Sequence, residues 1–276
     1  MKITFWGVRG SVPTPRKEVL GYGGNTTCVE VTASGLHFII DAGTGIIELG
    51  RKMTEQRAEK TIMLFTHLHH DHTQGFPFFQ PAFSSSFQFE VMSGDFFTKS
   101  AQEVLADSMS DPFFPVPLNS LASRLTFSEI SFEGSHVVSG LCNGVVDAIR
   151  LRHPRDGVVG YRFRENGKTM VFLTDCEHYE GRDELLIPFI RGTDLFVHDT
   201  MYTEAEYSNP LKSKVGWGHS TIEHAIEISK KAGVKKLVCT HHEPIHSDEF
   251  LDEVFEKAKQ SFPNILGAYE GLSLEV

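Results

Sequence analysis

The sequence predicts an α/β protein in which helices pack on the outside of β-sheets. Short apolar runs rich in β-branched residues, such as TIMLFTH at 61–67, are typical of buried strands. The segment STIEHAIEISKKAG at 220–233 has the spacing of an amphipathic helix. Strands, a helix and more strands precede a final strand–helix–strand order. The length of 276 residues fits one large domain, and we expect a single domain over 1–276.

The N-terminal part predicts strands at 2–8, at two places within 27–45 and at 61–67, with helical spacing at 46–53. The segment 76–130 is richer in Phe, Pro and Ser than the rest of the chain. Its two Phe-rich runs flank a helical stretch around 97–109. We expect it to be a long excursion that contains a strand and forms a lid, a pocket wall or a homodimer contact. Its aromatics are expected to pack in the core or at a dimer contact rather than on a nucleobase: Phe76, Phe78, Phe79, Phe113 and Phe114.

Strand patterns return after residue 131 and continue to the C-terminus. In GYRFRENGKTMVFLTD, Asn166-Gly167 suits the type I′ turn of a hairpin. Ser220 or Thr221 suits the N-cap of the 220–233 helix, and Gly233 suits its C-terminal end. KKLVCTHHEP predicts a strand and a loop, which a charged helix near 247–261 and a last strand follow.

Composition excludes several classes of function. The net charge of −10 and the pI near 5.8 disfavour binding of long nucleic acid, which needs a basic surface. A small phosphate ester held by metal ions remains compatible with this charge. No apolar run is long enough to cross a bilayer and the start lacks a signal-peptide pattern, so we expect a cytoplasmic protein without a membrane partner. The cysteines form no C-x-x-C pair, which argues against a zinc ribbon.

The stretch FTHLHHDHTQG at 65–75 concentrates four histidines and an aspartate. Alternate side chains of an extended segment point to the same side, so His67 and His69 can converge. If a helix begins next, Asp71 and His72 lie in its first turn and can face the same point. The spacing H-x-H-x-D-H therefore predicts a site for two adjacent metal ions rather than a solvated histidine-rich loop.

Three later strands each end in a group that can bind metal. His153 follows a strand in RLRHP, Asp175 in VFLTDCE and His241 in KLVCTHHEP. A single such residue is usually structural, but three of them beside H-x-H-x-D-H strengthen the prediction of a dinuclear site. Histidine and carboxylate ligands without a thiolate suit Zn²⁺, which we expect, and also Mn²⁺ or Fe.

The segments THLHHDH, DAGTG, LRHP, FLTDCE and VCTHHEP, in this order, resemble the metallo-β-lactamase superfamily over nearly the whole chain. The resemblance implies a four-layer αββα sandwich, an α/β fold, with a dinuclear metal site at one sheet edge. It implies that an early aspartate of DAGTG supports the ligand loop. The implied groups are His67, His69 and His153 on the first metal, Asp71, His72 and His241 on the second, Asp175 bridging both, and Asp41 in support.

The segments VHDT at 197–200 and GHSTIEHAIEISKKAGVKKLVCTH at 218–241 are similar to the phosphodiesterase branch, which includes ribonuclease Z and cyclic-nucleotide phosphodiesterases. In ribonuclease Z a Glu stands where this chain has Asp199. The resemblance implies that His219 contacts the scissile phosphate or the leaving oxygen and that Asp199 orients it. The glycine-rich segments GVRGSVPTP and GYGGNTTCVEV resemble the loops that border the cleft in this branch.

Only a predicted hairpin separates His153 from Asp175, which leaves no room for the protruding basic arm with which ribonuclease Z grips tRNA. We therefore expect a small phosphodiester as substrate, with a cyclic nucleotide as the leading candidate. A nuclease that processes RNA or DNA ends is the alternative. Thioester hydrolases, lactonases, di-iron oxidoreductases and a non-catalytic metal-bound sensor or scaffold also fit the fold.

The expected mechanism is attack on phosphorus by a hydroxide bound to two metal ions. Two divalent ions about 3.5–4 Å apart can share one water and lower its pKa towards neutrality. Asp71 is expected to orient this nucleophile, and a protonated His219 to donate to the departing alkoxide. A carboxylate partner such as Asp199 would raise the pKa of His219 towards that role.

Overall fold

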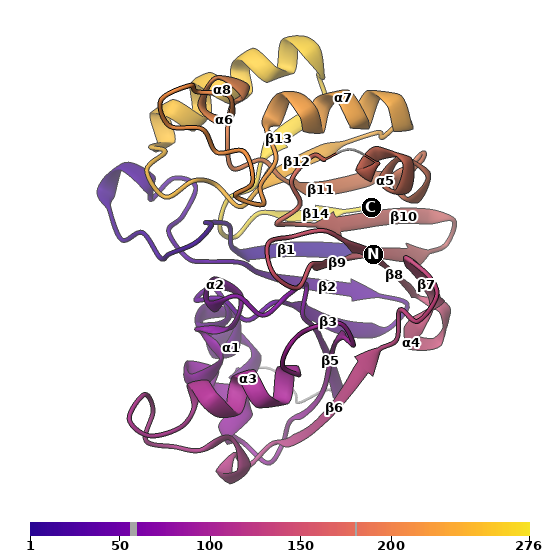
Figure 1. Ribbon diagram of the computed structural model, residues 1–276. Helices are drawn as coiled ribbons and strands as arrows, with labels where there is room; N and C mark the ends of the chain where they lie inside the picture. The colour runs from indigo at the N-terminus through magenta and orange to yellow at the C-terminus, as the bar shows by residue number, and fades with distance from the viewer. Residues whose placement is uncertain (56–59, 180) are drawn as a thin grey trace.

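Two seven-stranded sheets pack face to face in the computed structural model, which describes residues 1–55, 60–179 and 181–276. Helices cover the outer face of each sheet, so the layers run helix, sheet, sheet, helix (Figure 1). The order of strands in the first sheet is β14 (Ser273–Glu275), β1 (Lys2–Gly7), β2 (Cys28–Ala33), β3 (Leu36–Ile40), β4 (Lys60–Leu64), β5 (Gln88–Gly94) and β6 (Arg124–Ile130). The order in the second is β13 (Ile265–Gly267), β12 (Leu237–Thr240), β11 (Leu195–Asp199), β10 (Lys168–Leu173), β9 (Val158–Glu165), β8 (Val146–Leu151) and β7 (Val137–Gly140). The predicted αββα sandwich is confirmed.

The helices divide between the two outer faces. On the first sheet lie α1 (Ile46–Thr54), α2 (His70–Thr73) and α3 (Ala101–Ser108), and on the second α5 (Arg182–Ile190), α6 (Glu204–Tyr207), α7 (Ile222–Ala232) and α8 (Asp248–Ser261), with the short α4 (Leu141–Gly144) joining β7 to β8. Thr221 caps α7, since its side chain accepts a hydrogen bond from the backbone N–H of His224, and Gly233 ends the helix at a φ of 68°. The 220–233 prediction therefore matches the structure closely.

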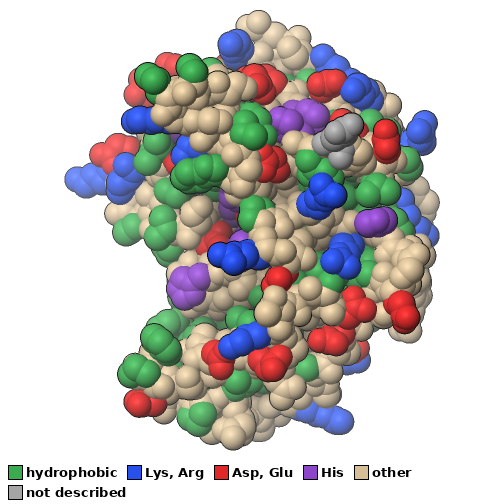
Figure 2. Space-filling view, in the orientation of Figure 1, with side chains coloured by type: hydrophobic (Ala, Val, Ile, Leu, Met, Phe, Trp, Pro, Cys, Tyr) green, Lys and Arg blue, Asp and Glu red, His purple; other side chains and the backbone are tan. Residues whose placement is uncertain are grey.

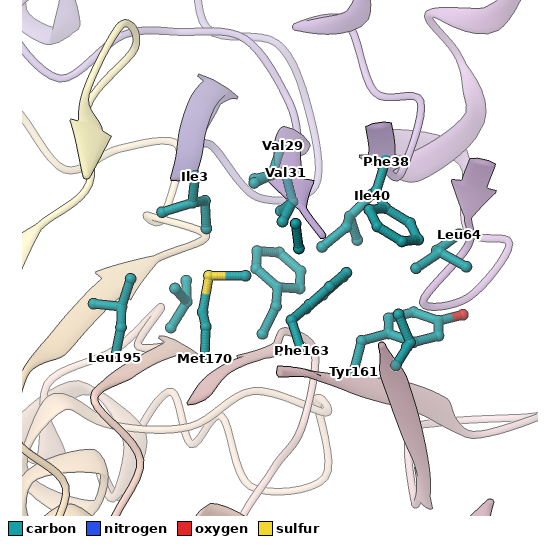
Figure 3. Packing of buried hydrophobic residues seen from close by; sticks show 14 of the residues in the cluster. Ile3, Val29, Val31, Phe38, Ile40, Leu64, Tyr161, Phe163, Met170 and Leu195 are labelled. Atoms are coloured by element: carbon teal, nitrogen blue, oxygen red, sulfur yellow. The ribbon is translucent and has the colours of Figure 1, made fainter. Parts of the chain in front are cut away.

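The main core lies between the two sheets, where apolar side chains alternate with outward-facing ones. Ile3, Val31 and Phe38 of the first sheet face Phe163 and Met170 of the second (Figure 3). All five side chains are buried. Two further apolar clusters lie under the outer helices, one beneath α5, α7 and α8 and one beneath α1 and α3. The sandwich is therefore rigid on both faces of each sheet, which fixes the strand ends that carry the candidate site.

The Phe-rich excursion is part of this framework. It contributes β5 and β6, which extend the first sheet in parallel from β4. Phe76 and Phe79 are fully buried in the core beneath α1 and α3, as core packing requires. Phe78 and Phe113 are exposed instead. Sequence analysis did not predict β6 as a strand of this sheet, nor α5, whose pattern is interrupted by Pro188.

Sheet topology brings several strand ends to one edge. In the second sheet β10, β11 and β12 are parallel, so Leu173, Asp199 and Thr240 all end on the same side. In the first sheet β3 and β4 are parallel and end at Ile40 and Leu64. Tyr161 of β9 donates a 2.6 Å hydrogen bond to the backbone oxygen of Phe65, which ties the two edges together. The residues that follow these strands therefore meet between the sheets.

Candidate metal centre

The histidine-rich stretch begins where β4 ends. The chain stays extended through His69, whose φ of −63° and ψ of 158° make it the N-cap of α2. Asp71 and His72 lie in the single turn of α2, which places them beside His67 as the spacing predicts. His70 points away and is exposed. The 65–73 segment therefore presents four polar side chains to one point.

Three imidazoles form the first group. His69 Nδ1 lies 3.0 Å from His67 Nε2 and 3.1 Å from His153 Nε2. Burial lowers the pKa of all three rings, that of His153 to about 4, so they are neutral near pH 7. Neutral imidazoles offer a nitrogen lone pair, and three of them that converge on one point can hold a cation.

Two histidines and two aspartates form the second group. His72 Nε2 lies 3.4 Å from Asp71 Oδ2 and 3.3 Å from Asp175 Oδ2. His241 Nε2 lies 3.2 Å and 3.3 Å from the same two oxygens. Asp175 also reaches the first group, because its Oδ1 lies 3.8 Å from His67 Nε2. The aspartate therefore stands between the two groups.

The charges of this second group favour a cation. Burial alone would lower the pKa of His72, but Asp71, Asp175 and Asp41 raise it well above its ordinary value. The neighbouring histidines hold the pKa of Asp175 well below its ordinary value despite burial. His72 Nε2 is buried and has no hydrogen-bond partner among the described residues. A divalent ion at this point would neutralise both carboxylates and satisfy that nitrogen.

Asp41 supports the ligand loop from behind, as predicted. Its carboxylate accepts hydrogen bonds from the backbone N–H and the hydroxyl of Thr66 at 2.8 Å and 2.7 Å. It also accepts from His72 Nδ1 at 2.8 Å, which turns His72 Nε2 towards Asp71 and Asp175. Asp41, Asp175 and His241 all have positive φ values, of 60°, 52° and 61°. Such strained backbone at three strand ends is typical of functional sites.

His219 and Asp199 form a pair beside the second group. His219 Nδ1 lies 2.9 Å from Asp199 Oδ2, which leaves Nε2 free. His219 stacks on His241 with ring centroids 5.0 Å apart, and its Nδ1 lies 3.6 Å from Asp175. Burial would lower the pKa of His219, but Asp199, Asp175 and Asp71 raise it to about 9. The raised pKa keeps His219 protonated near pH 7, and the ring lies beside the second group.

The N-terminal glycine-rich loop borders this space. The backbone N–H of Ser11 donates a 2.8 Å hydrogen bond to Asp71 Oδ2, a contact that sequence analysis did not anticipate. Gly10 packs so closely that a Cβ there would lie 2.5 Å from His241 Nδ1 and 2.2 Å from Met201 Cε. Glycine is therefore required at position 10 by close approach, which a single sequence cannot distinguish from an ordinary turn.

Glu177 is a second residue that sequence analysis missed. Its carboxylate accepts hydrogen bonds from Tyr207 Oη at 2.5 Å and from the backbone N–H groups of Gly216 and Gly218 at 2.6 Å and 3.0 Å. The backbone oxygen of Gly218 in turn lies 3.2 Å from His153 Nδ1. Glu177 thus fastens the segment immediately before His219 over the centre.

Two histidines outside the ligand groups differ in how well they were anticipated. His242 follows His241, and in an extended segment neighbouring side chains point to opposite sides, which predicts that His242 points elsewhere. Its Nε2 does so, lying 2.9 Å from the backbone oxygen of Ala268. The loop segment HHEPIHSD predicts a solvated His246, and this prediction is wrong. It is 6% exposed and its Nε2 lies 2.7 Å from Glu206 Oε1. This contact joins residues 40 positions apart, so no local pattern announces it.

An αββα sandwich with a His/Asp cluster at one edge is the arrangement of the metallo-β-lactamase fold. A family model described as "Beta-lactamase superfamily domain" matches residues 37–242, which is most of the chain. The chain belongs to this superfamily and is a metal-dependent hydrolase with the metallo-β-lactamase fold. The resemblance identified from its motifs is thereby confirmed.

Several relatives carry the same name. Ribonuclease Z of Brevibacillus brevis is 23% identical over 95% of this chain and 93% of its own length. Ribonuclease Z of Synechococcus sp. is 22% identical over 100% of this chain and 99% of its own length. Ribonuclease Z of Trichodesmium erythraeum is 31% identical, but over only 40% of this chain and 33% of its own length.

Solved structures show the same fold. Human tRNase Z, short form, superimposes with a TM-score of 0.69 at 19% identity, over 100% of this chain and 99% of that chain. The metallo-beta-lactamase fold protein YhfI from Bacillus subtilis superimposes with a TM-score of 0.68 at 17% identity, over 99% of both chains. Within the described ranges, no helix has the length and apolar character needed to cross a membrane.

Proposed function

We propose that the chain is a phosphodiesterase with two metal ions at the cluster. Asp175, which lies near both groups, would serve both ions, and Zn²⁺ is the expected metal, with Mn²⁺ or Fe as alternatives. The ligand sets are His67, His69 and His153 for one ion and Asp71, His72 and His241 for the other. The close approach of these nitrogen and oxygen atoms, all within 4.8 Å of one another in each group, supports the assignment.

Two divalent ions bound here would supply Lewis acidity and a water of lowered pKa. The chain's own residues then divide the remaining work. Asp71 is held by the Ser11 N–H and can orient the attacking water. His219 can give the Nε2 proton to the departing oxygen while Asp199 holds Nδ1. The hydrogen-bonded His219–Asp199 pair beside the cluster is the observation that carries the proposal, because the leaving alkoxide of a phosphodiester needs a proton.

We favour a nuclease acting on RNA over the cyclic-nucleotide phosphodiesterase that the short β9–β10 hairpin first suggested. Full-length relatives are named ribonuclease Z, whereas none of the described relatives is named a cyclic-nucleotide phosphodiesterase. The hairpin does turn at Asn166 and Gly167, with φ values of 50° and 75°, and leaves no arm between His153 and Asp175. The cyclic nucleotide stays a prediction, as do a cytoplasmic location and a homodimer.

A substrate panel tests the proposal. Protein reloaded with Zn²⁺, Mn²⁺ or Fe²⁺ is assayed on bis-p-nitrophenyl phosphate, a 3′-extended RNA, cyclic mononucleotides, a lactone and a thioester. We expect the diester and the RNA to be cleaved, and His219→Ala to lower kcat on both by about 10²–10⁴ with the bound metal retained. His37→Ala is the matched control, since His37 bonds Thr61 on the outer part of the first sheet. Cleavage of the lactone or thioester alone would overturn the proposal.

A further inference from the structure

A groove rich in arginine lies beside the candidate metal centre. It has a volume of about 580 Å³, within the range of ligand sites, and His153 forms part of its wall. The residues that characterise it, here named the arginine groove, are His136, Arg150, Arg152, Arg155, Asp156 and Tyr179. Figure 2 shows Lys and Arg side chains on the face next to the indentation that holds His and acidic side chains.

Among the residues that the structure describes, no carboxylate lies within ion-pair distance of the arginines of this groove. Within residues 1–55, 60–179 and 181–276, Arg150, Arg152 and Arg155 form no ion pair. Two of them lie on aromatic rings instead: the Arg150 guanidinium is 4.0 Å from the centroid of Phe96 and that of Arg152 is 5.2 Å from that of Tyr179. Stacking fixes a guanidinium in space without cancelling its charge, so its N–H groups remain available to an anion.

Other arginines of the chain are used differently. Arg162 and Arg164 both pair with Asp147, and Arg51 pairs with Glu48 and Glu55. The chain carries a net charge of −10, so unpaired cations gathered in one groove run against its overall composition. A local basic surface is the feature that the whole-chain charge conceals.

The loop that carries the groove is held rigidly. Asp156 is the one carboxylate among the described lining residues, and it accepts hydrogen bonds from the backbone N–H of Thr98 at 3.0 Å and from its hydroxyl at 2.7 Å. Arg155 has a φ of 77°, a conformation that costs about 1–3 kcal/mol for a side chain of this kind. Arg155 and His153 both line the groove, so this strained residue lies next to the candidate ligand.

We propose that the arginine groove binds the phosphates of a single-stranded oligonucleotide whose scissile bond lies at the metal centre. The proposal rests on the proposed function and extends it. This chain lacks the basic arm with which ribonuclease Z grips tRNA, and the arginine groove would bind the phosphates instead. Arg152 and Arg155 each contact one phosphate, and Tyr179 positions Arg152. A cyclic mononucleotide has no second phosphate to reach this track, so the groove selects chains over single nucleotides.

Binding of a fluorescein-labelled ten-nucleotide RNA, and of DNA of the same sequence, tests the groove through fluorescence anisotropy on metal-bearing protein. The double variant Arg152→Gln/Arg155→Gln is compared with wild type between 50 mM and 300 mM salt. Each phosphate contact adds about 0.7 to the slope of log Kd against log salt for a single strand. We expect the double variant to lose about 1.4 of slope, which at 0.1 M salt is roughly a 25-fold weaker Kd.

Three comparisons make the result decisive. Arg124→Gln removes an exposed arginine of β6 outside the groove and is expected to bind as wild type does. Arg152→Lys/Arg155→Lys keeps the charge and is expected to restore most of the slope. The metal content of each variant is the third comparison and is expected to match that of wild type, because neither arginine is a predicted ligand. A wild-type slope and Kd in the Gln double variant, or an equal loss in Arg124→Gln, would refute the phosphate track.

Failure of the proposed function is distinguishable from failure of the groove. A protein that cleaves no diester but shows the expected loss of slope would keep the groove and remove the phosphodiesterase assignment. If the wild type cleaves RNA but the Gln double variant keeps the wild-type salt slope, the phosphodiesterase assignment stands and the groove proposal is refuted. Equal binding of RNA and DNA would identify the phosphate chain itself as the ligand, and preference for RNA would add its 2′-hydroxyl groups.

Discussion

Glu177→Ala tests how the segment before His219 is held. The carboxylate accepts three hydrogen bonds, two of them from backbone N–H groups of Gly216 and Gly218. Hydrogen bonds to a charged group contribute about 1.5–3 kcal/mol each, and exposure of Gly216 reduces its share. Only the two backbone N–H bonds hold this segment, each at the lower end of that range, so we expect Glu177→Ala to destabilise its observed position by about 3 kcal/mol. Glu177→Gln keeps one acceptor oxygen and is expected to destabilise it by about 1 kcal/mol.

The loss is expected in turnover rather than in metal content. Since 1.4 kcal/mol corresponds to a factor of ten, the loss of kcat/KM is at most about 150-fold for Glu177→Ala and about fivefold for Glu177→Gln. Steady-state kinetics on bis-p-nitrophenyl phosphate, metal analysis and thermal melting of the same samples measure the three effects. The neighbouring Glu184→Ala, an exposed residue of α5, is the matched control. Unchanged kcat in Glu177→Ala, or a fall explained by lost metal, would refute this account.

Three further predictions concern metal, core and pH. Chelation is expected to lower Tm, because an ion at 1,000 times its Kd adds about 4 kcal/mol of stability that EDTA removes; an unchanged Tm would contradict the assigned centre. Phe163→Ala is expected to cost about 3–5 kcal/mol in urea unfolding, since Phe163 is fully buried between the sheets. Burial alone would raise the pKa of Asp194, but hydrogen bonds from Lys235, the Thr169 N–H and Lys168 lower it to about 2. The ionised Asp194 therefore stabilises the folded protein fully above its ordinary pKa near 3.8, and this contribution is lost as pH falls through 2. In thermal melting, Asp194→Asn should be less stable than wild type at pH 7 and equal to it near pH 1.5.

Motifs at strand ends made much of the centre predictable from sequence. Each predicted ligand follows a short apolar strand, and parallel strands of one sheet bring such ends together wherever they lie in the chain. Asp71 and His72 were predictable because the turn of α2 starts directly after His69. Local spacing and strand order were thus sufficient for the residues that occupy the centre.

The contacts that support the centre could not be predicted, because they use backbone groups or join residues far apart in the sequence. Ser11 reaches Asp71 through its backbone N–H, which any residue type provides, so no residue identity marks it. Glu177 reaches Tyr207 and Gly218 across 30 and 41 positions, and no periodic pattern spans such distances. β6 was missed because its exposed side chains alternate weakly, since it is the edge strand of its sheet. Sequence reasoning therefore identified the residues that converge at the candidate centre better than the residues that support them.

The proposed centre draws its ligands from both leaves of the sandwich. The loop after β4 in the first sheet supplies His67 through His72, and strand ends of the second supply Asp175 and His241. Under this assignment bound metal would link the two sheets, so that separation of the sheets and release of metal would be one cooperative event. Amide hydrogens of β3 and β10, on either side of that seam, should then exchange far more slowly in the metal-loaded protein, whereas those of the outlying α3 should hardly respond.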